Sequence, residues 1–334
     1  MKQVNCKFQQ GFSLLEVFIA LAIGLVIFAG VLSIFVGMRT TTTETTSYGE
    51  LQENGRFAIS VLTNDISKQD FWGDYIGSAS LNSFNHTLAP PGNDCTGAGV
   101  NNASFPLAVG TFRTLWGTTA ANVNPMGCFS DAKIGSDIIQ VKKVLANDLV
   151  DVAGDPVATA PAGNYHLVTN VSGGTLFTSG AVPVVDNSRV WQYQHHVYYV
   201  REETQGTNTV PVLMQGQLTT KMTFSPIIDG IEMIRYMYGY DADTDPNAPG
   251  YGKVDAFISA QNMTRAMWNN TGGTKIIAVK VYVLARNITP DNKYTNTNTY
   301  QLGDLTFTPP ANDHFRRLLF SSTVTLYNAR VDSW

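Results

Sequence analysis

Charged residues are scarce in this sequence. Only 14% of its 334 residues are Asp, Glu, Lys or Arg, the net charge is −4, and no cluster of Lys and Arg interrupts the mildly acidic balance. A dedicated nucleic-acid-binding protein usually carries a basic stripe, so we expect no such site here. Hydrophobic residues make up 44% of the chain, which is enough to bury a core. Asn, Thr, Gly and Ser replace the missing charges, as in many exported, β-rich bacterial proteins.

The sequence also lacks the motifs of common catalytic sites. No G-x-S-x-G, H-E-x-x-H or P-loop pattern occurs in it. His195 and His196 are adjacent in an apparent strand, so they lie on opposite faces and cannot jointly hold one ion from that strand. We therefore predict that the protein is not an enzyme, and that its histidines have structural or surface roles: His86, His166, His195, His196 and His314.

One long segment has no charge at all. The 22 residues from Val17 to Met38 are uncharged, which is long enough for a helix to cross a bilayer. A secretory signal peptide would place a small-residue cleavage site after the apolar segment, and none is present. One interpretation is an uncleaved anchor that holds Lys2 and Lys7 in the cytoplasm. The other is cleavage before the apolar segment, between Gly11 and Phe12.

Glu16 is a lone carboxylate at the start of this segment. After cleavage at Gly11, Phe12 would carry a free amino group one helical turn from Glu16. The carboxylate could then compensate the positive N-terminus of its own chain or of a neighbouring subunit. Alternatively, Glu16 lies at the headgroup level of an ordinary membrane anchor. The spacing of these residues leaves both interpretations open.

Longer stretches of sequence resemble a known family. The segment GFSLLEVFIALAIG resembles the class III leader and N-terminal helix of type IV pilins and pseudopilins. This resemblance implies that a prepilin peptidase cuts after Gly11 and N-methylates Phe12, and that Glu16 makes the first assembly contact. Three further segments resemble PilW-type minor pilins: QENGRFAISVLTNDISKQDFWG, DGIEMIRYMYGYDADTD and RRLLFSSTVTLYNAR.

The resemblance implies a function in the type IV pilus. PilW-type proteins are non-catalytic subunits of a tip or priming complex that initiates assembly and helps present a PilY-type adhesin. The implied partners are other minor pilins, the major pilin, the prepilin peptidase and the inner-membrane assembly platform. The head would be periplasmic before assembly and at the pilus tip afterwards, where adhesion and twitching motility are system-level outcomes. A J-type pseudopilin of type II secretion and a single-pass anchored binding protein are the alternatives.

The pattern along the chain predicts an α+β, pilin-like fold. We expect a leader over residues 1–11, a long helix over 12–70 with a transmembrane part at about 17–38, and a β-rich head over 71–334. The Thr-rich segment Thr40–Tyr48 is weakly helical and suggests a flexible or partly melted section. The head is expected to be a mainly antiparallel sheet with long loops, in which we predict five strands: Asp137–Val144, Trp191–Val200, Ile231–Tyr240, Lys275–Ala285 and Leu318–Tyr327.

The three cysteines fit an exported head. Cys6 would leave with the leader, so the mature chain would keep an even pair, Cys95 and Cys128. Both lie in loop-like sequence on the far side of the membrane, where an oxidising periplasm favours a disulfide. We therefore predict a bond between them.

One acidic segment suggests a metal site. Asp241, Asp243 and Asp245 alternate in DADTDPNAPGY, as at the start of a calcium loop. Pro246 stands where an EF-hand has Gly, and Gly252 stands where it has Glu, so this is not an EF-hand. A looser Ca²⁺ loop remains as a weak hypothesis, and a solvated turn is the alternative; otherwise we expect no cofactor.

Overall fold

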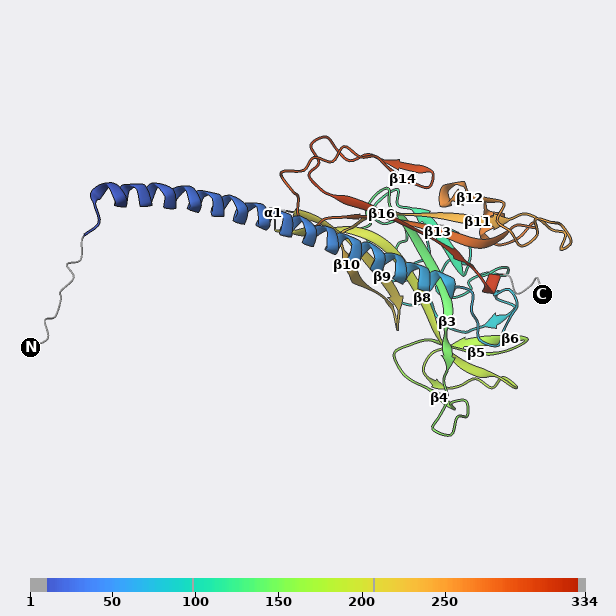
Figure 1. The fold of residues 1–334 in the computed structure, drawn as a ribbon. Coiled ribbons are helices and arrows are strands. Elements are labelled where there is room, and N and C mark those ends of the chain that lie inside the picture. Colours follow the sequence, from blue (N-terminus) through green and yellow to red (C-terminus); the bar gives the residue numbers. More distant parts are fainter. Residues whose placement is uncertain (1–10, 98, 207, 330–334) are drawn as a thin grey trace, which may run out of the picture. The chain divides into compact units, whose positions relative to one another are not determined.

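The computed structural model describes residues 11–97, 99–206 and 208–329 and divides the chain into two compact units. The first unit runs to Glu50 and the second from Leu51 to the end of the chain. The helix α1, Leu14–Ser67, belongs to both units (Figure 1). It lies inside the predicted range of 12–70, whereas residues 1–10 of the predicted leader lie outside the described residues.

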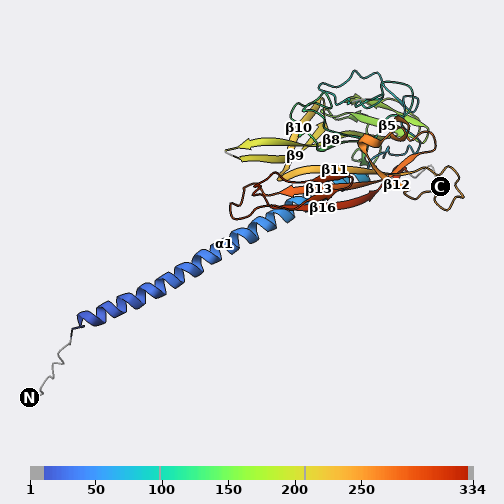
Figure 2. The same cartoon turned by 90° about the horizontal axis from the view of Figure 1, so that it is seen from above.

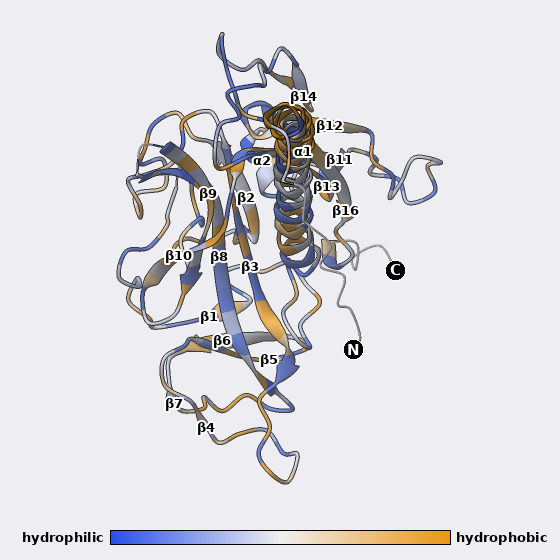
Figure 3. Cartoon of the chain, turned by 60° about the vertical axis from the view of Figure 1, so that its left-hand side comes forward, coloured by the Kyte–Doolittle hydropathy of each residue, from blue (hydrophilic) through white to orange (hydrophobic). Residues whose placement is uncertain are grey.

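The first unit includes the apolar turns of α1, which Figure 3 colours as hydrophobic. The helix is long and apolar enough to cross a membrane, and its apolar window is not buried. Helical backbone continues through Thr40–Tyr48, so the partly melted section suggested for it is not present. The hydroxyl of Thr42 donates a hydrogen bond to the carbonyl of Met38 (2.9 Å), so this side chain is satisfied within the helix.

The second unit contains two large sheets, seen as separate layers in Figure 2. The strands of the first follow the order β1-β6-β5-β8-β3-β2, and β9 pairs with both β8 and β10. All neighbours are antiparallel except β1 and β6. The bounds are β1 Phe84–Asn85, β2 Leu115–Thr119, β3 Asp137–Asp148, β5 His166–Asn170, β6 Gly173–Phe177, β8 Arg189–Gln205, β9 Asn208–Leu218 and β10 Met222–Asp229.

The second sheet is antiparallel throughout, in the order β12-β11-β13-β16. Its strands are β12 Ala256–Ser259, β11 Ile231–Asp241, β13 Lys275–Arg286 and β16 Arg317–Thr325. The short elements are β4 Thr159–Ala160, β7 Gly180–Ala181, β14 Tyr300–Leu302, β15 Leu305–Phe307, η1 Ala260–Asn262 and α2 Arg265–Trp268. The α+β fold and the five predicted strands are confirmed as β3, β8, β11, β13 and β16, but these strands are divided between two sheets.

The last turns of α1 pack into the core of the second unit. Leu51, Ala58, Leu62 and Ile66, which recur at helical spacing, are all buried. Gly55 lies on the same stretch, where an added Cβ would come within 2.0 Å of the ring of Phe320 on β16. This glycine therefore lets the helix approach the second sheet closely.

A buried carboxylate connects the same part of α1 to the first sheet. Asp65 accepts hydrogen bonds from Tyr198 (3.0 Å) and Lys143, and its Oδ2 contacts His196 Nδ1 at 2.8 Å. Gln215 then donates to the hydroxyl of Tyr198 (2.8 Å). Burial opposes ionisation, but the hydrogen bond and charge of His196 and the charge of Lys143 lower the pKa of Asp65 well below its usual range. These contacts stabilise the ionised carboxylate between helix and sheet.

We predict that Asp65→Asn lowers the free energy of unfolding of the head by about 3–5 kcal/mol at pH 7, because it breaks a buried ion pair. The folded chain binds this proton more weakly than the unfolded chain. The stabilisation is therefore complete above the ordinary carboxyl pKa of 3.8 and is lost as the pH falls below it. Denaturant unfolding of the wild type and variant at several pH values measures this difference.

The exposed Asp186 provides the control, since Asp186→Asn removes the same charge without removing a buried contact. If Asp65→Asn and Asp186→Asn have the same small effect at pH 7, the proposed contribution of the buried network is contradicted.

Candidate functional site

The predicted cleavage site lies just before α1. Gly11, Phe12 and Ser13 are outside the helix and exposed, and the side chain of Phe12 is 86% exposed. A Cβ added to Gly11 would meet no atom within 4 Å. The fold therefore places no steric demand on Gly11, so any requirement for glycine here would come from an enzyme that recognises this segment.

Glu16 belongs to a reciprocal cap at the start of α1. The Ser13 backbone N–H donates to Glu16 Oε2 (3.1 Å), and the Glu16 N–H donates to Ser13 Oγ (3.2 Å). This S-x-x-E arrangement is a capping box, which satisfies backbone groups that the first helical turn leaves free. The sequence analysis missed it, although the spacing of Ser and Glu before an apolar segment was a sufficient signal.

Two glycines of the apolar part are open to their surroundings. Among the described residues, a Cβ added to Gly24 or Gly30 would meet nothing within 4 Å. Ala20 and Gly24 form a small-xxx-small pair, which allows close approach of helices in membranes. These small residues lie at exposed positions of α1, where another helix could approach the backbone closely.

The predicted disulfide is present between Cys95 and Cys128, which are 33 residues apart and buried. Two side-chain amides bind the neighbouring carbonyls: Gln140 donates to the carbonyl of Cys95 and Asn93 to that of Cys128 (2.8 Å). Gln140 lies on β3, so the bond and these contacts fasten the long loop region to the first sheet.

We expect that mature protein, denatured without reductant, reacts with no thiol label, and that reduction exposes both cysteines. Replacing both by Ser should lower the free energy of unfolding by about 3–4 kcal/mol on the chain-entropy account of a loop of this length. Labelling followed by mass spectrometry and denaturant unfolding measure the two effects. Labelling of both cysteines without reductant would contradict the bond.

The acidic segment forms a cluster that differs from the predicted one. Carboxylate oxygens of Asp241, Asp243 and Asp255 lie within 4.8 Å of one another. Asp245 lies outside this group, and its Oδ1 instead accepts from the N–H of Asn247 (2.9 Å). Asp241 is buried and already accepts from the N–H groups of Asp243 (2.9 Å) and Gly252 (2.7 Å). The structure thus replaces Asp245 by Asp255 as the third carboxylate.

Calcium binding stays a prediction, now on Asp241, Asp243 and Asp255. Three carboxylates without a bidentate Glu should bind Ca²⁺ with a Kd of about 1 mM or weaker. Calorimetry on the processed chain in detergent measures it, and Asp255→Asn should remove the heat while Asp245→Asn keeps it. No heat and no change in Tm at about 10 mM Ca²⁺ would dismiss the site.

Three of the five histidines are buried, as expected of side chains with a structural role. His195 and His196 do lie on opposite faces of β8: His196 contacts Asp65, whereas Nδ1 of His195 contacts Ser104 Oγ at 2.8 Å. His166 is buried in β5. His86 and His314 contact backbone carbonyls, of Pro106 (2.7 Å) and Tyr294 (2.5 Å) respectively.

Two family models match the chain. The model of type IV pilus-assembly protein W, PilW, matches residues 197–328, and the model of the prokaryotic N-terminal methylation motif matches residues 6–32. The first match runs from within β8 to beyond β16, and the second includes Gly11, Phe12 and Glu16. No curated protein and no solved structure matches the chain. The matches confirm the resemblance of the leader and of the segments DGIEMIRYMYGYDADTD and RRLLFSSTVTLYNAR, whereas QENGRFAISVLTNDISKQDFWG lies outside both matches.

Proposed function

From the two family matches, which support a type IV pilus minor pilin of the PilW type with a class III prepilin leader, we propose that this chain acts in the complex that initiates assembly at the pilus tip. In this role the chain enters the inner membrane with its head in the periplasm. Prepilin peptidase cuts between Gly11 and Phe12 and methylates Phe12. The assembly platform then joins it to other minor pilins and the major pilin, and the complex helps present a PilY-type adhesin.

One observation supports the assembly role most directly: a lone carboxylate lies in the first turn of an apolar helix whose surface the chain leaves uncovered. Leu14, Leu15 and Phe18 around Glu16 are 87%, 69% and 70% exposed. Lipid tails cover such a surface as well as other helices do, so apolar burial by itself gives little preference for the assembled state. A charge in this position is unfavourable by a few kcal/mol unless it is paired. Pairing with the amino terminus of another subunit would therefore favour assembly.

The cap explains how the carboxylate is presented. Glu16 Oε2 accepts from the Ser13 N–H, which fixes the carboxylate at the N-terminal end of α1. Phe12 immediately precedes Ser13, so the new amino group would lie close to this carboxylate. The negative charge also stabilises the positive end of the helix dipole. The cap and the intermolecular pair are thus two functions of one side chain, and they can be separated by mutation.

We predict that Glu16→Gln lowers the recovery of minor-pilin partners at least about tenfold, the effect expected when roughly 1.4 kcal/mol or more of pairing is lost. Gln at this position keeps the capping box but removes the charge. Ser13→Ala removes one hydrogen bond of the cap and keeps the charge, so it should retain most of the recovery. The measurement is co-purification of partners from membranes with the processed tagged chain.

A blot for the processed form controls for cleavage, which Glu16→Gln and Ser13→Ala should leave intact. Gly11→Leu is the opposite control, because it should leave an uncut precursor whose head still folds. Full recovery with Glu16→Gln would reject the charge pair and leave Glu16 as a capping residue. Equal losses in Glu16→Gln and Ser13→Ala would assign its role to the cap.

The place in the pilus needs a separate experiment. Fibres sheared from cells should contain this chain together with a PilY-type adhesin, and antibody labelling should mark fibre ends. Deleting the gene should reduce the number of fibres, not their length. Labelling along the whole fibre would reject the tip position. Copurification with type II secretion proteins instead of pilins would favour a pseudopilin, which shares the N-terminal motif.

A further inference from the structure

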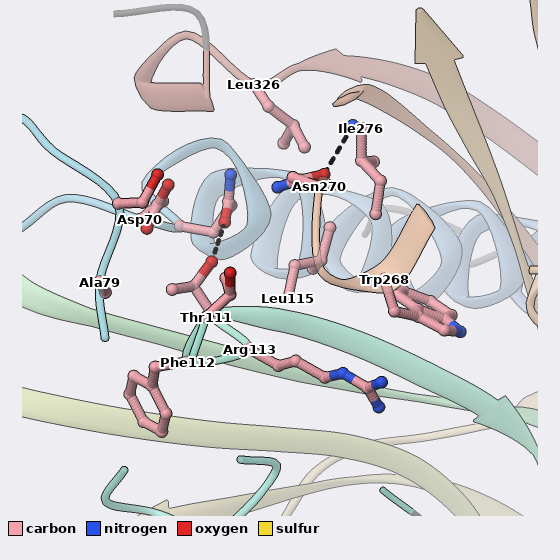
Figure 4. A pocket seen from close by; sticks show the side chains of 13 residues that line it. Asp70, Ala79, Thr111, Phe112, Arg113, Leu115, Trp268, Asn270, Ile276 and Leu326 are labelled. Carbon is pink, nitrogen blue, oxygen red and sulfur yellow. Dashed lines mark hydrogen bonds between the residues drawn. The ribbon is translucent and has the colours of Figure 1, made fainter. Parts of the chain in front are cut away.

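A groove on the second unit is lined by positive charge without a compensating acidic residue. Its volume is about 340 Å³, and its lining includes two arginines and no acidic residue. It lies where β2 meets η1 and α2, and Arg113, Arg265, Trp116 and Trp268 all line it. Figure 4 shows Arg113 and Trp268 extending to the same side of an adjoining small cavity, which both residues also line.

Arg113 is a buried cation held by neutral groups. Its side chain donates to Asn269 Oδ1 from Nε (2.9 Å) and approaches Asn102 Oδ1 from Nη1 (3.4 Å), and the residue is only 5% exposed. Burial lowers its pKa, and the charge of Arg265 lowers it further. Gly99 leaves room for the guanidinium, because a Cβ there would come within 2.3 Å of Nη1.

Arg265 adds a second positive charge to the groove. It is the first residue of α2 and is exposed. Within the described parts of the chain, neither Arg113 nor Arg265 forms an ion pair with a carboxylate. Two guanidinium groups beside one groove repel each other, and an anion between them would remove this repulsion.

Part of the groove wall is apolar. The rings of Trp116 and Trp268 lie 6.2 Å apart between centroids, with their planes at 48°, and both residues are buried. Met263 and Val100 contribute further apolar surface. The site therefore combines fixed positive charge with aromatic surface, which is the composition of a pocket for an organic anion.

We propose that this groove binds an organic carboxylate, with its charge between Arg113 and Arg265 and its apolar part against Trp116 and Trp268. The planar fork of a guanidinium matches a carboxylate with two parallel hydrogen bonds. The volume suits a small acid or the last residue of a polypeptide chain, and both sources offer the same chemistry. The inference goes beyond the proposed assembly role and does not depend on it.

Titration of the processed full-length chain in detergent tests this proposal, with tryptophan fluorescence or calorimetry as the readout. Phenylacetate represents a free acid, and the peptide Gly-Gly-Phe represents a chain terminus. Phenylacetamide and amidated Gly-Gly-Phe are the neutral controls. We expect both acids to bind at least about tenfold more tightly than their amides, because each amide loses a charge-assisted pair. The tighter of the two acids identifies the source.

Variants of the exposed Arg265 avoid disturbing the core. Arg265→Gln should weaken acid binding at least about tenfold, and Arg265→Lys should be intermediate because it keeps the charge but loses the fork. Arg56→Gln, an exposed position on α1, removes the same charge elsewhere and should change nothing. Equal binding of acids and amides, or unchanged binding with Arg265→Gln, would overturn the proposal. So would inorganic phosphate binding as tightly as phenylacetate.

Discussion

The constraint on which the whole molecule depends is that one helix has to satisfy two different surroundings. The turns of α1 before Leu51 have no protein core to cover their apolar side chains, whereas the turns after it are buried against the sheets. The first part therefore requires lipid or the helices of other subunits. Moving from lipid to a helical assembly changes little apolar burial, so polar groups and close packing decide the preference. A few residues, Glu16 and the small residues near it, would therefore decide whether this part of the helix prefers lipid or a helical assembly.

Inside the head, buried charges are usually matched. Asp65 has Lys143 and His196, and Arg235 Nη1 lies 3.0 Å from Asp137 Oδ1. Glu232 similarly pairs with Arg317 between strands of the second sheet. Each pair offsets part of the free energy that burying its charges costs, and each also fixes one element against another. Among the described residues two buried cations have no such ion pair: Arg113, and Lys142, whose Nζ donates to the backbone carbonyls of Asn102 (2.8 Å) and Arg113 (2.9 Å).

Paired and unpaired buried charges differ in whether they need a ligand. A pair such as Arg235 and Asp137 needs no ligand because both charges are compensated within the fold. Arg113 is comparably buried, but the groups beside it are cations: Arg265 lines the same groove, and Lys142 Nζ donates to the Arg113 carbonyl (2.9 Å). A protein gains no stability from that arrangement, since like charges repel and buried cations lose hydration. An external anion supplies the compensation that the sequence itself does not provide there.

Much of the fold could be predicted because its signals are local. Short windows of sequence are enough to indicate these elements. β-Branched residues indicate the strands β3, β8 and β13, and the spacing of Leu51, Ala58 and Leu62 indicates a helix. Leu284 shows the limit of this reasoning: it is buried against Leu302 of the β14–β15 hairpin and Met233. Such covering depends on segments distant in sequence.

Sites formed by residues close in sequence could also be predicted, whereas sites formed by distant residues could not. The leader junction and Glu16 form a local motif and could be predicted, and the even number of cysteines left after leader removal predicted the Cys95–Cys128 bond. The partner of Asp241 and Asp243 could not, because Asp255 reaches them only through the turn that returns the chain to β12. Arg113 and Arg265 are farther apart still, and nothing near either residue in the sequence indicates that one groove contains both.

The cap of α1 leaves room for the assembly contact proposed for the same carboxylate. Glu16 uses Oε2 for the Ser13 N–H, and among the described residues no hydrogen bond to its Oε1 is present. An ionised carboxylate has several acceptor positions, so it can keep the cap and still accept from an ammonium group. Capping also removes rotamer freedom that an intermolecular pair would otherwise have to restrict. The cap therefore would not compete with the proposed pair: it holds the charge in place and would lower the entropy lost if the pair forms.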